Sequence, residues 1–191
     1  WQKDSSVTLQ NGIKVKKVSY RPDYLTFIEY PQLSGIKNAA AENIINEKLK
    51  EDFTYSVNSN NSDSAGNSGD SDDEEYLEEI TCGFSVLVNK DLLVIEKNGY
   101  WYPIGAAHGM PSLDYIYIDL KTGAFYQLKD LFKSGSNYAD KLTSIVQDHI
   151  NKHSRIAYIS GFEKYYVSDV SVSENLLFFI GSDSLKIYFS P

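Results

Sequence analysis

The chain has 191 residues, a length that fits one domain or two small subdomains with a common core. It carries 18 basic and 26 acidic side chains, for a net charge of −8, which argues against a nucleic-acid partner because such partners need a basic face. An acidic surface instead attracts cationic partners. The single cysteine, Cys82, excludes an internal disulfide framework and any multi-cysteine metal site.

No stretch approaches 18 consecutive apolar residues, so we expect no membrane span, and no signal peptide is visible. The chain starts at Trp1 without an initiator Met. We therefore expect a mature or trimmed fragment, attached to a membrane only through an anchor outside this chain.

The first predicted element is a β-hairpin over residues 7–20. Asn11-Gly12 separates its two alternating runs, and this pair accepts the positive φ angles of a type I′ turn. A further strand is predicted over residues 24–30. Pro31 is expected to end it, because proline cannot donate to the ladder.

A helix is predicted over residues 35–53, with Ser34 as its N-cap and apolar side chains at helical spacing. The segment 56–75 that follows is rich in Ser, Asn, Gly and Asp, and we interpret it as an acidic, disordered insertion. The alternative is an EF-hand-type calcium loop that begins at Asp70. However, Glu75 stands where such a loop needs Gly, so we expect no specific site.

The remaining strands are predicted over residues 76–88, 92–104, 114–120, 124–128, 166–167, 176–180 and 185–189. A phase slip near Gly83 suggests a bulge in the first of them. Cys82 lies in that alternating run and is interpreted as a buried core thiol. A second helix is predicted from a cap at Ser136 or Asn137 to about Lys152.

This order predicts an α+β fold with a mainly antiparallel sheet and two principal helices, because hairpins join most strands. Three segments are expected: a strands-plus-helix module over residues 1–55, the acidic insertion over 56–75, and a sheet-plus-helix module over 76–191. Two subdomains that share a sheet are consistent with this pattern.

Five short stretches resemble one family, the PdaC/RsiV-like extracytoplasmic domains. Residues 30–36 and 41–46 resemble its first module, and residues 105–109, 119–123 and 128–132 resemble its second module, in the same order. The acidic insertion and the end at Pro191 depart from the family pattern.

The resemblance implies an α+β fold, an extracytoplasmic location of the Gram-positive type, secreted or on the cell surface, and a binding role. Members of this family occur in anti-sigma factors that sense lysozyme, and they precede the catalytic domain of a peptidoglycan deacetylase. The resemblance does not imply catalysis here, because the deacetylase chemistry belongs to a separate domain.

The residues themselves show no catalytic constellation and no cofactor motif. His108 lies in a glycine-rich corner, where it either braces the turn or contacts a ligand. His149 and His153 share a helix face, but no third zinc ligand is evident, so a solvated helix end is the preferred interpretation and no metal is expected. Asp114 and Asp119 flank one strand and point to opposite faces, which argues against a joint acid/base role.

The predicted contact residues are Tyr100, Trp101, Tyr102 and His108. Three consecutive aromatic residues on one strand place at least one ring on the face away from the core, and such rings anchor protein or sugar ligands. The alternative, that neighbouring elements cover both faces, stays open.

We therefore predict a non-catalytic extracytoplasmic binding or sensing domain for a protein or cell-wall ligand. A cationic, lysozyme-like protein is one candidate partner. The alternative function is a peptidoglycan-directed enzyme or an accessory domain of one.

Overall fold

The computed structural model describes residues 6–9, 11–63, 77–89, 91–159, 171–172, 176–181 and 183–188. The chain divides into two compact units, Trp1–Phe125 and Tyr126–Pro191. The strands on both sides of the predicted insertion lie in one sheet, and the division falls between residues 125 and 126, in the last strand of that sheet. Among the described residues, no helix is both long and apolar enough to cross a membrane.

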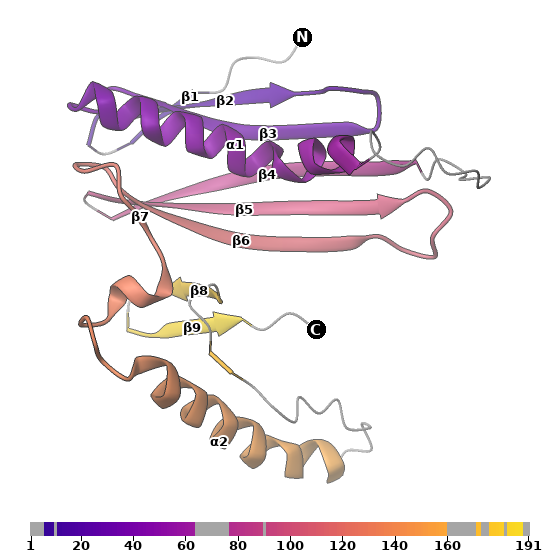
Figure 1. Cartoon of the computed structure of the whole chain (residues 1–191), viewed down its shortest axis with the longest axis vertical. Coiled ribbons are helices and arrows are strands. Elements are labelled where there is room, and N and C mark those ends of the chain that lie inside the picture. The colour runs from indigo at the N-terminus through magenta and orange to yellow at the C-terminus, as the bar shows by residue number, and fades with distance from the viewer. Residues whose placement is uncertain are drawn as a thin grey trace. The chain divides into compact units, whose positions relative to one another are not determined.

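The first unit is a twisted sheet with one long helix (Figure 1). Its elements are β1 (Ser6–Thr8), β2 (Lys14–Tyr20), β3 (Thr26–Ser34), α1 (Ala39–Asp63), β4 (Glu78–Asn89), β5 (Leu92–Pro103) and β6 (Met110–Asp119), and β7 (Phe125–Tyr126) stands at the boundary between the units. The sheet order follows the chain, β1-β2-β3-β4-β5-β6-β7. The predicted α+β class, with a mainly antiparallel sheet and two principal helices, is confirmed.

Among the strand pairs of this sheet whose register is described, one is parallel, namely β3 with β4. It is short, joining Thr26 to Ile80 and Ile28 to Cys82. Parallel neighbours need a long crossover connection, and α1 lies in that connection. The antiparallel hairpins on either side therefore meet at a single parallel seam.

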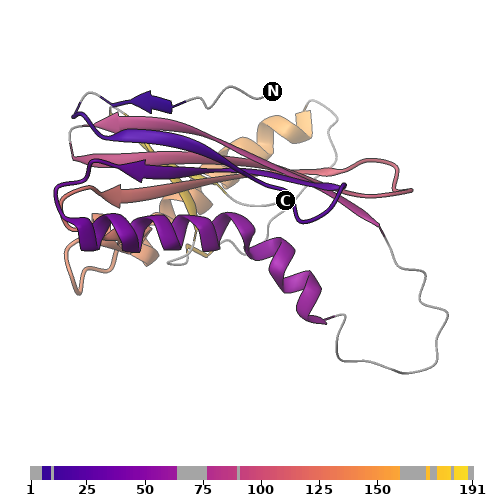
Figure 2. The ribbon, with the colours of Figure 1, turned by 90° about the horizontal axis from the view of Figure 1, so that it is seen from above.

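The core of this unit lies between α1 and one face of the sheet (Figure 2). Ile45, Leu49 and Phe53 recur every four residues along α1 and are 0–1% exposed. They pack with sheet residues that include Ile28 and Ile95. Burial of this helix face supplies the main apolar contact of the unit.

The helix begins at Ala39, so the predicted N-cap at Ser34 is wrong. Ser34 is the last residue of β3. Gly35 follows with a φ of +90°, and the chain changes direction there before the helix begins. Asn38 takes the capping role, because its Oδ1 accepts the N–H groups of Ala40 and Ala41 at 3.1 and 3.2 Å.

The helix also extends ten residues beyond the predicted end at residue 53, to Asp63. Its last eight residues fall within the segment predicted as an insertion. The rest of that segment, from residue 64, lies outside the described residues.

The N-terminal hairpin is confirmed, but its turn is not the predicted two-residue type I′ turn. Leu9 N–H donates to Ile13 O at 2.8 Å and Gly12 N–H donates to Leu9 O at 2.9 Å, so the strands close at Leu9 and Ile13 and not at the residues on either side of Asn11-Gly12. Gly12 has a φ of +82°, and glycine is the residue that adopts this conformation without strain.

Pro31 does not end β3, as the sequence had predicted; it is buried within the strand, opposite Lys17. The reason lies two residues further on. Leu33 N–H donates to Asn46 Oδ1 at 2.7 Å and Leu33 O accepts from Asn46 Nδ2 at 2.9 Å, so the Leu33 backbone faces away from β2. Residues two apart on a strand share one hydrogen-bonding edge. Pro31 therefore faces the β4 side of β3, beyond the three residues with which β4 pairs. Its missing N–H thus removes no hydrogen bond between these strands.

The pairing of β4 with β5 runs without interruption from Glu78–Pro103 to Asn89–Leu92. The predicted bulge near Gly83 is therefore wrong, because Gly83 pairs one-to-one with Asn98. The alternation of core-facing and outward-facing side chains along β4 continues from Ile80 onward.

The second unit contains a short 3₁₀ turn (Leu128–Leu131), α2 (Tyr138–Ile159), and a two-stranded antiparallel sheet of β8 (Leu177–Ile180) and β9 (Leu185–Tyr188). The predicted second helix and last two strands are present. Thr143 Oγ1 on α2 accepts the N–H of Val172 at 2.9 Å. The strand predicted over 166–167 lies outside the described residues.

Candidate functional site

The predicted contact residues lie where β5 ends and turns into β6. Large apolar side chains are exposed here, and we define the sheet-end surface as Leu77, Tyr100, Ile104 and Met110, with the half-buried Trp101 and Tyr102. Backbone pairing places them beside one another in two pairs: Ile104 N–H donates to Leu77 O at 2.8 Å, and Trp101 pairs with Met110, which therefore lies on the same face of the sheet as Trp101. Such a group of exposed apolar residues is typical of an interaction site.

The three consecutive aromatic residues alternate between the two faces of the sheet. Leu93 and Ile95 belong to the core that includes α1, so Trp101, at the same parity on β5, lies on that face. Tyr100 and Tyr102 lie on the opposite face, and Tyr100 is 42% exposed.

Hydroxyl groups of β5 hold the turn over residues 104–109. Tyr102 Oη donates to Ala106 O at 3.1 Å, and Tyr100 Oη accepts the N–H of Gly109 at 3.1 Å. Gly109 is buried against these groups, and a Cβ there would meet the Tyr100 ring and lie 2.7 Å from Trp101 O. Only glycine fits this position without displacing these groups, so the turn packs closely against the Tyr100 ring.

His108 is exposed on this turn, and its Nδ1 lies 3.2 Å from Gly109 O. This contact agrees with a bracing role, and the exposure leaves the imidazole available to a ligand. His149 is exposed on α2, while the side chain of His153 lies outside the described residues. Across the described part of the chain, no group of three or more His, Cys, Asp or Glu side chains could hold a metal ion.

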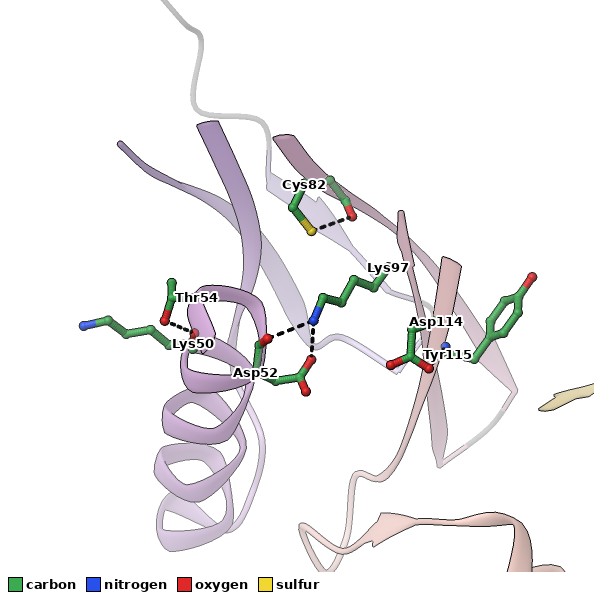
Figure 3. Close-up of polar contacts among 8 residues, drawn as sticks. Lys50, Asp52, Thr54, Cys82, Lys97, Asp114 and Tyr115 are labelled. Atoms are coloured by element: carbon green, nitrogen blue, oxygen red, sulfur yellow. Dashed lines mark hydrogen bonds and ion pairs between the residues drawn. The ribbon is translucent and has the colours of Figure 1, made fainter. Parts of the chain in front are cut away.

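A second polar site, which the sequence did not predict, lies between α1 and β5. Lys97 Nζ donates to Asp52 O at 2.8 Å and to Asp52 Oδ2 at 3.0 Å (Figure 3). The same ammonium lies 5.0 Å from the centre of the Phe53 ring. Lys97 has the parity of Ile95, so the alternation of β5 already placed it on the face toward α1.

An open depression of about 360 Å³ surrounds this pair. It is lined by Lys48, Glu51, Asp52, Tyr55 and Lys97. The lining contains as many carboxylates as ammonium groups, so the depression has no net charge to attract an ion.

Two further groups are perturbed near Lys97. Burial raises the pKa of the Cys82 thiol above its ordinary value, and the positive charge of Lys97 opposes that shift. Burial likewise raises the pKa of Asp114, while the hydrogen bond from Tyr115 N–H lowers it. Cys82 packs against the apolar core, which agrees with the predicted core thiol, although it is only partly buried.

Residues 19–111 match the family model described as Deacetylase PdaC. This segment is a PdaC-like domain. It begins in β2 and ends in β6, so it includes α1, the sheet-end surface and Lys97.

The other comparisons add little to this assignment. No curated protein matches the chain. Among solved structures, a DUF3298 family protein from Pseudomonas aeruginosa PAO1 is similar at 12% identity and a TM-score of 0.42, over 85% of this chain and 71% of that chain.

Residues that carry the family resemblance have structural roles in the PdaC-like domain. Asn46 binds the backbone of Leu33, and Glu42 Oε2 accepts the N–H of Ile36 at 2.9 Å. Both contacts join the start of α1 to the end of β3. Residues 105–109 form the turn that the tyrosine hydroxyls hold. These stretches therefore mark the fold and do not identify a reaction.

Proposed function

We propose that this chain is a non-catalytic extracytoplasmic domain that binds a protein or cell-wall ligand through the sheet-end surface. The observation that supports this proposal is the exposure of large apolar side chains at this end of the sheet, where Leu77, Tyr100, Ile104 and Met110 are 42–54% exposed. The hydrogen bonds between the turn and the Tyr100 and Tyr102 hydroxyls hold these two rings in place, which lowers the entropy cost of binding.

Charge favours a cationic partner. The chain has a net charge of −8, and Glu79 pairs with Tyr102 on β5. Cross-strand neighbours share a face, so this exposed carboxylate lies beside the face that carries Tyr100. A basic side chain placed there would meet both a carboxylate and an aromatic ring. A lysozyme-like protein is one partner with this chemistry.

The second candidate is an accessory role for a peptidoglycan-directed enzyme. The description of the matching family model, Deacetylase PdaC, favours it. In that case the sheet-end surface would hold the cell-wall polymer, and catalysis would come from a separate domain.

The test is calorimetric titration of the chain with a lysozyme at low and high salt. We expect binding that weakens as salt rises, because exposed charges are screened. Ile104→Ser should weaken it about tenfold, which corresponds to the loss of one interface anchor. Ile44→Ser is the matched control, because Ile44 is 57% exposed on α1.

Absence of binding at low salt by folded protein would exclude the lysozyme partner. An equal effect of the two substitutions would exclude the sheet-end surface. In a parallel assay, binding to purified peptidoglycan without lysozyme binding would favour the accessory role, and release of acetate from muropeptides by this chain alone would contradict a non-catalytic domain.

A further inference from the structure

The helix α1 follows the sheet as far as Phe53 and then bends away from it (Figure 2). Ile45, Leu49 and Phe53 are buried at intervals of four residues, and the next positions in this series are Val57 and Asn61. The terminal turns of α1, residues 54–63, are mostly polar in sequence. They would therefore gain little free energy from burial against the sheet.

Two polar contacts at the bend engage backbone carbonyl oxygens of α1. Lys97 Nζ donates to Asp52 O at 2.8 Å, and Thr54 Oγ1 donates to Lys50 O at 2.8 Å (Figure 3). In a straight helix the Asp52 carbonyl accepts only the N–H four residues later. A donor that draws a carbonyl outward lengthens the helical hydrogen bond on that side, so the helix curves away from the donor. Lys97 is on the sheet, and the contact therefore turns the terminal turns of α1 off the sheet.

A straight α1 would continue over the part of the sheet that carries Trp101. Ala41 lies against Gly123 near the start of β5, and Asp52 binds Lys97 farther along that strand, so α1 runs in the direction of β5. The ten residues 54–63 span about 15 Å as a helix, and the four steps from Lys97 to Trp101 span about 14 Å on a strand. The terminal turns are thus long enough to reach Trp101.

We propose that Lys97 holds the terminal turns of α1 away from the sheet and thereby keeps the Trp101 side of the sheet-end surface open to a partner. Trp101 is half-buried, and its cross-strand neighbour Met110 is 54% exposed while α1 is bent. Lys97 is a positioning residue, because it acts through the carbonyl of Asp52. The binding of a partner rests on the proposed function, whereas the position of the helix does not.

The carbonyl contact and the ion pair of Lys97 can be separated by substitution. The Asp52 side chain is 45% exposed, so water screens its attraction to the ammonium group. Asp52→Ala removes the carboxylate but leaves the carbonyl oxygen that accepts Lys97. Lys97→Met removes the donor to both groups and keeps a long unbranched side chain. Asp52→Ala is therefore the matched control for Lys97→Met.

The experiment measures the distance between two spin labels by double electron–electron resonance in a Cys82→Ser chain. The labels are attached at Ser62→Cys, near the end of α1, and at Glu79→Cys, on the face of the sheet opposite α1, where the label does not obstruct the helix. A rotation of the terminal turns by about 30° moves residue 62 by roughly 7 Å, because nine residues of helix span about 14 Å. We expect the mean distance in Lys97→Met to be shorter by about this amount, and that in Asp52→Ala to equal the wild-type distance.

Quenching of Trp101 fluorescence by acrylamide, in a Trp1→Phe chain, provides the second measurement. In Lys97→Met the quenching constant should fall about twofold, because the helix would cover one of the two faces of the ring. In Asp52→Ala it should not change.

A label distance in folded Lys97→Met that is unchanged, longer or only broader would overturn the proposal. An Asp52→Ala chain that matches Lys97→Met would also overturn it, because the ion pair and not the carbonyl contact would then hold the helix. Both measurements are made without a ligand, so a failure to bind lysozyme would count against the proposed function alone.

Discussion

The contact between Asn46 and Leu33 makes a prediction whose size follows from the structure. The Asn46 side chain on α1 binds both backbone groups of Leu33, in the place where a neighbouring strand would otherwise stand. Asn46→Ala removes both hydrogen bonds beside a residue that is only 1% exposed. At about 1 kcal/mol for each bond, the free energy of unfolding should fall by about 2 kcal/mol.

Alanine has a higher helix propensity than asparagine, so a gain in helix stability would offset part of this loss in the free energy of unfolding. Asn43→Ala supplies the control, because Asn43 is exposed on the same helix and gains the same propensity. The difference between the two variants isolates the contact with Leu33.

Urea denaturation followed by tryptophan fluorescence is the assay, since both tryptophans, Trp1 and Trp101, belong to the first unit. With a slope of about 2 kcal/mol per M, the midpoint of Asn46→Ala should lie about 1 M below that of Asn43→Ala. Equal midpoints would show that water replaces the asparagine and would refute the reasoning.

Three further predictions concern the sheet. Gly109→Ala should lower the free energy of unfolding by about 1–3 kcal/mol in urea denaturation, because the added Cβ meets the Tyr100 ring and Trp101 O. Gly83→Ala is the control, since its Cβ would meet only the movable end of a side chain. Equal losses of stability in the two variants would contradict the steric account. Because burial raises the pKa of the Cys82 thiol, this cysteine should react with a disulfide reagent at pH 8 at least about tenfold more slowly than in urea-unfolded protein, and equal rates would show that the thiol is not shielded. Lys97→Met removes a positive charge that lowers this thiol pKa, so the pKa should rise further; a thiolate absorbance titration that shifts to lower pH would contradict that sign.

The alternation of apolar residues predicted the fold class and most strands, because a half-buried sheet face imposes a period of two on the sequence. Errors arose where long-range pairing decides the outcome. Pro31 remains within β3 because β4, fifty residues later, pairs only with the start of that strand. No local signal reports which edge of a strand will be unpaired.

The candidate site was predicted in part. The aromatic run on β5 indicated alternating rings, and the structure places them at the end of the sheet. Lys97 was missed because a lysine is normally interpreted as solvent-exposed, although its parity with Ile95 already placed it on the core face. Its partner Asp52 lies 45 residues earlier, so no sequence spacing connects the two.

The parallel pairing of β3 with β4 also indicates where the length of the chain can change. α1 and β4 are each fixed to the sheet by their own contacts, so the pairing does not depend on the length of chain between Asp63 and Leu77. Each doubling of a loop costs only about 0.6 kcal/mol. Insertions or deletions at this join should be tolerated, and residues 1–63 and 77–191 should reassemble as two separately expressed fragments.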